Sequence, residues 1–158
     1  MSVGISDIRT VPVGEDLTAE DLRLQVVRGL EQAKRADYPL ADLSTVLLTG
    51  EWAVLNASSQ AVRASSTPVG QTYPVFSGTD RFDARATGNV TLLLASNVVI
   101  KSSVFDDTAT YAVGSYLTVK DLGGGESKVT LRSGSEPRLA RVLEVASTYL
   151  VYETLQGV

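Results

Sequence analysis

The chain has 158 residues, about the length of one domain, and contains no cysteine and no histidine. Serine–histidine and cysteine–histidine catalysis, disulfide bonds and the two usual zinc ligands are therefore excluded. The formal net charge is −4, from 14 Lys and Arg against 18 Asp and Glu. This balance argues against a nucleic-acid partner, because phosphate binding needs a concentrated basic face.

Residues 1–16 predict an extended arm. Polar residues, Pro12 and Gly14 separate its apolar residues, which are Val3, Ile5, Ile8, Val11 and Val13. Two interpretations carry equal weight: a frayed terminus or edge strand, and an arm that pairs with a neighbouring chain. The segment has neither the basic start nor the apolar run of a signal peptide, and no later segment has the length of a membrane span. We therefore expect synthesis in a cytoplasm and no membrane partner.

Residues 18–36 predict an amphipathic helix. Thr18 can cap its start, and Glu20 and Asp21 lie in the first turn, where the helix dipole favours acidic residues. Apolar residues recur on one face at helical spacing; they are Leu22, Val26, Leu30 and Ala33. The step into Pro39 ends the helix. We expect this apolar face to pack on the core of the protein itself rather than on a partner.

A strand is predicted within residues 46–55, and it contains the only tryptophan of the chain. Trp52 is interpreted either as a ligand platform or, more commonly, as an anchor in a core or an interface, because its large apolar area dominates wherever it is buried. Residues 57–71 are rich in small and turn-forming residues and predict a surface excursion.

The remainder of the chain predicts short strands at a spacing of about ten residues. They cover residues 73–76, 90–95, 98–100, 116–120, 128–132, 139–145 and 149–155, with a hairpin over 146–148. The predicted fold is mainly β within the α+β class: a small β-barrel or β-sandwich with an N-terminal extended arm and one α-helix. Residues 1–45 form the arm and helix, and residues 46–158 form the β domain.

Asp107 is the one catalytic-looking residue. The tripeptide Asp107-Thr-Ala109 resembles the Asp-Thr-Ala of aspartic proteases, in which two carboxylates share a proton across a dimer. Such a protease has an apolar strand running directly into the aspartate, whereas Lys101, Ser102, Ser103 and Asp106 intervene here. A turn of ordinary Asp-Asp-Thr composition explains the tripeptide more simply.

Other polar clusters also favour structural interpretations. Residues 123–128 lack the Gly-Lys-Ser/Thr order and the following helix of a phosphate-binding loop, so they predict a hairpin tip. Ser127 and Lys128 are neighbours on a strand and point to opposite faces, which excludes a serine–lysine pair. Asp80 and Asp83 are too few for a calcium cage, and pairing with Arg81 or Arg85 is expected instead. We expect no cofactor and no metal ion.

Several segments carry a family resemblance. They are Tyr111-x-Val-Gly-x-x-Leu-Thr-Val-Lys120, Gly134-x-x-Pro137, Ala140-Arg-Val-Leu-Glu-Val145, Tyr149-Leu-Val-Tyr152, Thr49-Gly-Glu-Trp-Ala-Val-Leu55 and Pro74-Val-Phe-x-Gly-Thr-Asp-Arg-Phe-Asp83. The first four resemble the closing strands of capsid decoration proteins, also called cement proteins, of tailed bacteriophages. The last two resemble segments of phage structural proteins that share this ending.

The resemblance implies a virion structural protein, not an enzyme, that binds the outer surface of the assembled major capsid protein lattice and stabilises the head. It implies a homotrimer on the outside of the capsid, made in the host cytoplasm. The expected partner contacts are Val3, Ile5, Ile8 and Val11 of the arm, and Trp52. The alternatives are another phage component, such as a tail-tube, tail-terminator or head-fibre base protein, and, remotely, an aspartic-type protease using Asp107.

Overall fold

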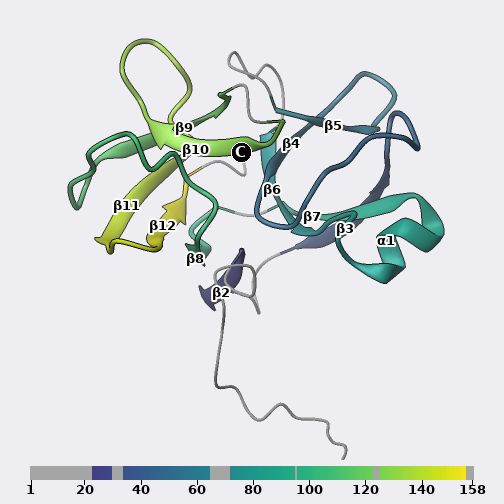
Figure 1. Ribbon diagram of the computed structural model, residues 1–158, viewed down its shortest axis with the longest axis horizontal. Helices are drawn as coiled ribbons and strands as arrows, with labels where there is room; N and C mark the ends of the chain where they lie inside the picture. The colour runs from purple at the N-terminus through teal and green to yellow at the C-terminus, as the bar shows by residue number, and fades with distance from the viewer. Residues whose placement is uncertain (1–22, 30–33, 65–71, 95, 123–124, 156–158) are drawn as a thin grey trace, which may run out of the picture.

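The computed structural model describes residues 23–29, 34–64, 72–94, 96–122 and 125–155. These residues form two antiparallel sheets, of six and five strands, and one short helix (Figure 1). The two sheets pack around shared apolar residues, as two-layer β proteins do. The mainly β fold predicted from the sequence is therefore confirmed as a sandwich-like arrangement, because the described strands do not close into a barrel.

The six-stranded sheet contains the C-terminal strands. Its order is β10-β9-β11-β12-β8-β2, and its strands are β2 (Gln25–Arg28), β8 (Val99–Ser102), β9 (Tyr116–Asp121), β10 (Ser127–Leu131), β11 (Ala140–Val145) and β12 (Leu150–Thr154). β11 and β12 form the predicted hairpin, with a bulge between Val142 and Glu144. Beyond β8, Phe105 makes an isolated parallel bridge to Val129 of β10. The chain that follows β8 therefore reaches the opposite edge of its own sheet.

The five-stranded sheet carries the helix. Its order is β3-β7-β6-β4-β5, and its strands are β3 (Arg35–Pro39), β4 (Trp52–Leu55), β5 (Ala61–Arg63), β6 (Thr72–Ser77) and β7 (Asn89–Leu93). Helix α1 (Phe82–Thr87) connects β6 to β7 and ends at Gly88, whose φ of 76° suits glycine. Figure 1 shows α1 on the side of this sheet away from the six-stranded sheet.

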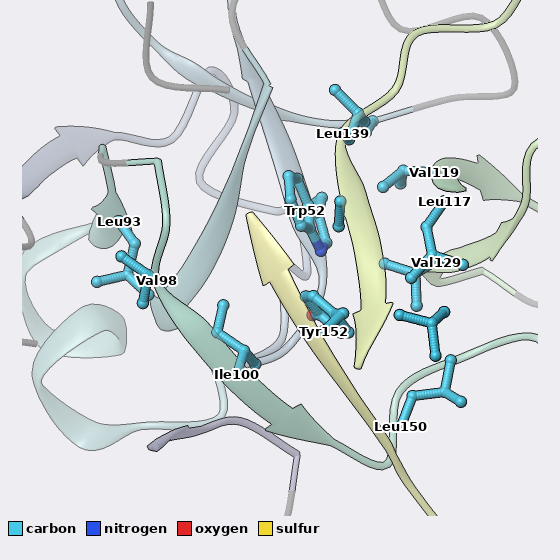
Figure 2. Packing of buried hydrophobic residues seen from close by; sticks show 13 residues of the cluster. Trp52, Leu93, Val98, Ile100, Leu117, Val119, Val129, Leu139, Leu150 and Tyr152 are labelled. Atoms are coloured by element: carbon cyan, nitrogen blue, oxygen red, sulfur yellow. The ribbon is translucent and has the colours of Figure 1, made fainter. Parts of the chain in front are cut away.

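A continuous core joins the two sheets (Figure 2). Trp52 and Leu93 enter it from the five-stranded sheet, and Ile100, Leu117 and Tyr152 enter it from the six-stranded sheet. Side chains on a strand alternate between faces, so Ala53 and Leu92, next to Trp52 and Leu93, point away from this core. Each fully buried Leu or Ile contributes about 1.5–3 kcal/mol.

A second core lies on the outer face of the five-stranded sheet. Ala53, Val90 and Leu92 pack there against Ala84 of α1 and Leu47 of the preceding loop. The five-stranded sheet is thus buried on both faces over part of its area. The helix and the loop over residues 40–48 cover the outer one.

The helix predicted over residues 18–36 is wrong in the part that the structure describes. Val26 lies in β2 opposite Ile100 of β8, and residues 35–39 form β3, which pairs with β7. Gly29 between them has a φ of 95°, which no right-handed helix contains. Pairing with strands distant in sequence therefore overrides the local 3.6-residue pattern. Residues 23–39 contribute a strand to each sheet.

The helix that does form lies between the strands predicted over residues 73–76 and 90–95, where no helix was predicted. It has six residues, from Phe82 to Thr87. Only about one and a half turns are present, and Ala84 is its buried anchor. A helix this short has no repeated apolar spacing for the sequence to display. Among the described residues, no helix is long and apolar enough to cross a membrane.

Candidate functional site

The predicted partner-binding residues divide into two groups. Trp52 is fully buried between the two sheets, so the core alternative for this residue holds in the folded chain. Its indole ring lies 6.3 Å from the ring of Tyr152, centroid to centroid. Burial raises the pKa of the Tyr152 hydroxyl to about 12. The arm residues Val3, Ile5, Ile8 and Val11 lie outside the described residues.

Asp107 lies in an exposed turn after Phe105. Its neighbour Asp106 accepts hydrogen bonds from the Thr108 backbone nitrogen at 3.0 Å and from the Thr108 and Thr130 hydroxyls at 2.6 and 2.7 Å. Burial raises the pKa of Asp106, but these hydrogen bonds outweigh it, and the pKa lies below its ordinary value. The Asp-Asp-Thr segment therefore folds as the turn that its composition predicts.

A polar recess of about 370 Å³ opens beside this turn. Arg23 Nη2 and Glu126 Oε1 form an ion pair of 2.6 Å there, and Lys128 and Asp107 also line the recess. The two basic and two acidic side chains balance, so the recess selects neither anions nor cations by net charge. Within the described ranges, no group of three or more acidic residues is placed to hold a metal ion.

Glu51 is a fully buried carboxylate that sequence reasoning did not single out. Its Oε1 accepts from Arg63 Nε at 2.8 Å and from the Ser127 backbone nitrogen and hydroxyl at 2.9 and 3.1 Å. Its Oε2 accepts from the Leu48 backbone nitrogen at 2.8 Å. One side chain therefore connects β4 to β5, to β10 of the other sheet and to the loop before β4.

A second network fixes that loop against the segment before α1. Asp80 Oδ1 accepts from the Thr49 backbone nitrogen and hydroxyl, both at 2.8 Å. Burial raises the pKa of Asp80, but the hydrogen bonds from Thr49 outweigh it, and the pKa falls below its ordinary value. Asp80 also lies 3.6 Å from Arg81, as predicted. A Cβ on Gly78 would lie 2.2 Å from the Leu47 carbonyl oxygen, so the two segments approach as only glycine allows.

These networks frame an apolar groove, which we call the α1 groove. It has a volume of about 450 Å³ and lies between residues 40–48 and residues 84–88. Leu40, Leu43 and Val46 line one wall, and Ala84 lines the other. Leu43 and Val46 of this lining expose 81% and 54% of their surface. Phe82, the first residue of α1, lies outside the lining and exposes 73%. Exposed apolar surface beside a groove is typical of sites that contact another apolar surface.

Sequence reasoning missed the α1 groove, although one signal was present. Phe82 is a large aromatic residue between Arg81 and Asp83, in a segment otherwise made of turn-forming and charged residues. An apolar side chain in such a segment has no local core to join. Phe82 itself lies outside the groove lining, at the start of the helix that forms one wall. Arg85 of the same helix lines the groove and is exposed, and it gives the groove a basic edge.

Comparison with protein-family models, with curated proteins and with solved structures finds no match to this chain. The lining of the α1 groove is mostly apolar, and the exposed guanidinium of Arg85 lies at its edge. An apolar lining with a polar edge is typical of surfaces that associate with another protein.

Proposed function

We propose that this protein is a capsid decoration protein of a tailed bacteriophage. It binds the outer surface of the assembled major capsid protein lattice as a homotrimer and stabilises the head. One observation carries the proposal: the segments that resemble decoration proteins form neighbouring strands. Residues 111–120, 140–145 and 149–152 contain most of β9, β11 and β12, which lie side by side in one sheet.

The architecture supports an assembly role. The two sheets share a core and are linked by the buried Glu51, so the body can act as a rigid block. The α1 groove leaves apolar surface exposed on that block. Both features suit a protein whose work is binding, because a preorganised surface loses little entropy on association.

The proposed mechanism is mass action. A protein that binds only the assembled, expanded lattice stabilises that state by its binding free energy at every site. At a concentration 100 times the dissociation constant, the stabilisation is about 2.7 kcal/mol per site. Repeated over many equivalent sites, this amount raises the force or temperature that the shell withstands.

The test is occupancy on capsids that lack the protein. Purified protein is mixed with expanded and with unexpanded capsids, and bound copies are counted by quantitative gel analysis and cryo-electron microscopy. We expect binding to the expanded lattice and a higher temperature of capsid disruption. Deletion of residues 1–14, which removes Val3, Ile5, Ile8 and Val11, is expected to reduce occupancy. Ser6→Ala with Thr10→Ala is the control within the same segment. Full occupancy after the deletion would remove the arm from the contact.

The same experiment separates the alternatives. A decoration protein is present in hundreds of copies on a particle, whereas tail-end proteins such as a tail-tube or tail-terminator protein form a ring of a few copies at one vertex. Labelling at a single vertex would overturn the proposal. For the protease alternative, Asp107→Asn would abolish processing of a co-expressed capsid precursor; unchanged processing would remove it.

A further inference from the structure

The α1 groove lies next to the point where the N-terminal segment, residues 1–22, joins the described fold. Arg23 Nε donates a 2.6 Å hydrogen bond to the Thr49 carbonyl oxygen, and the Arg23 carbonyl oxygen accepts from the Ser102 hydroxyl. A Cβ on Gly50 would lie only 2.5 Å from that same carbonyl oxygen. The residue before Thr49 is Leu48, which lines the groove. The segment therefore leaves the body from a fixed point close to the groove.

The N-terminal segment complements the groove in charge and in apolar character. It holds five of the 18 acidic residues and one of the 14 basic residues, so it carries the whole formal net charge of −4. Five of its apolar residues fall between Val3 and Val13, and four acidic residues follow them before Arg23: Glu15, Asp16, Glu20 and Asp21. The groove offers apolar walls and the exposed cation of Arg85.

The length of the N-terminal segment limits how far from Arg23 its apolar residues can lie. Between Val13 and Arg23 the chain can span up to about 35 Å, and the full segment can span about 70 Å. A folded body of this size has a radius of gyration of about 14 Å. A spacer of this length is therefore long enough to bring the apolar residues to the groove of a neighbouring copy. Binding in the groove of the same copy is the competing outcome, which the experiment below tests.

We propose that the α1 groove binds the N-terminal segment of a second copy of this chain. Apolar side chains among Val3, Ile5, Ile8, Val11 and Val13 fill the space between residues 40–48 and α1, and Asp7 faces Arg85. This contact is made by side chains, so Pro12, which lacks a backbone donor, is compatible with it. Each copy offers one segment and one groove, and such a heterologous contact closes into a ring where the rotation allows.

This inference deepens the proposed function, because it names the groove that would hold the homotrimer together, and it is tested without any capsid. Sedimentation equilibrium and native mass spectrometry of the full chain give its mass. We expect an oligomer that loses at least tenfold in association constant with Leu43→Asp, with Val46→Asp, or with Ile5→Asp combined with Ile8→Asp. Val113→Asp is the matched control, since Val113 is 70% exposed and lies beside β11, away from the groove.

A mixing experiment distinguishes this contact from all others. The Leu43→Asp chain has an altered groove and an unchanged N-terminal segment. The Ile5→Asp, Ile8→Asp chain has an altered N-terminal segment and an unchanged groove. Neither is expected to associate alone, and an equimolar mixture is expected to form a one-to-one dimer. Circular dichroism spectra matching the parent show that each variant is folded.

Three results would overturn the inference: a monomeric parent chain, a mixture that stays monomeric, or groove variants with unchanged mass. Concentration-independent protection of residues 43–48 from hydrogen exchange in a monomer would show the segment bound in its own groove, and would overturn it as well. A chain that stays monomeric and still decorates capsids refutes the groove contact and the homotrimer, and leaves the decoration role unaffected. A chain that forms the ring and binds no capsid refutes only the decoration role.

Discussion

Replacing Glu51 by glutamine is expected to destabilise the fold by about 2–4 kcal/mol. The side chain is fully buried, and its oxygens accept four hydrogen bonds. A glutamine amide has one acceptor oxygen, so its NH₂ group must face either the Leu48 nitrogen or the three donors from Arg63 and Ser127. Leaving a buried donor unsatisfied costs about 1–3 kcal/mol.

The charge adds a second contribution. Removing one member of a buried ion pair costs about 3–5 kcal/mol when the partner is also buried. The side chain of Arg63 is 24% exposed, so water screens its unpaired charge and this contribution falls to about 1 kcal/mol. Together the two effects give the expected 2–4 kcal/mol.

The assay is urea unfolding followed by circular dichroism at one protein concentration, because association would shift the apparent stability. Glu153→Gln is the matched control: it makes the same chemical change in a surface ion pair with Arg141, whose atoms lie 3.4 Å apart. That pair is expected to contribute less than about 1 kcal/mol. If the unfolding free energies of the two variants agree within about 0.5 kcal/mol, a typical surface effect, the bridging role of Glu51 is refuted.

Three further outcomes are expected. Gly78→Ala should destabilise the fold by about 1–3 kcal/mol in the same assay, because the added Cβ would lie too close to the Leu47 carbonyl oxygen. Gly114→Ala is the comparison: its Cβ would meet nothing within 4 Å, and its φ is 93°, so it measures backbone strain without crowding. Trp52→Ala should cost about 3–5 kcal/mol and leave a cavity between the sheets, and a smaller loss would contradict its place in the core. The hydrogen bond from Lys120 and that from the Ser133 backbone lower the Glu136 pKa to about 2. The folded protein therefore favours the ionised form of Glu136. The stability that this carboxylate contributes should be fully present above the ordinary pKa of 4.5 and should be lost as the pH falls toward 2. Carbon-detected NMR titration gives the pKa directly, and a value near 4.5 would contradict it.

The C-terminal strands were predictable because local and tertiary signals agree there. Alternating residues in β9 and β11 place Leu117 and Val142 in the core, and turn-forming residues separate each strand from the next. β10 and β12 pair with strands close to them in sequence. For such hairpins, the sequence near a strand contains most of the information that positions it.

The N-terminal strands were not predictable in the same way. Val26 sits at a position that serves equally well on a helix face or on a strand, and only its partner Ile100 decides between them. Two β-branched residues, Val26 and Val27, precede Gly29 and were a weak signal for a strand. Because the pairing partner lies far along the chain, the local periodicity of residues 23–36 cannot indicate it.

The α1 groove escaped prediction for a related reason. Its two walls come from residues 40–48 and 84–88. Hydrogen bonds between Thr49 and Asp80 and between Leu47 and Thr79 bring the two segments together. Within its own segment, none of the residues in these hydrogen bonds indicates that it has a partner in the other segment. A site made by such long-range polar contacts becomes visible only when both segments are in place.

The same contacts explain how a rigid body can keep an apolar surface open to solvent. The exposed residues Leu43 and Val46 belong to a loop whose next residues are anchored three times: Leu47 to Thr79, Leu48 to Glu51, and Thr49 to Asp80. Without these anchors the loop could fold Leu43 inward and hide the groove. Because Glu51 also accepts a hydrogen bond from Ser127 of β10, the groove wall is connected to the six-stranded sheet. A variant that breaks this connection should therefore lose groove binding as well as stability, whereas Leu43→Asp should lose only binding.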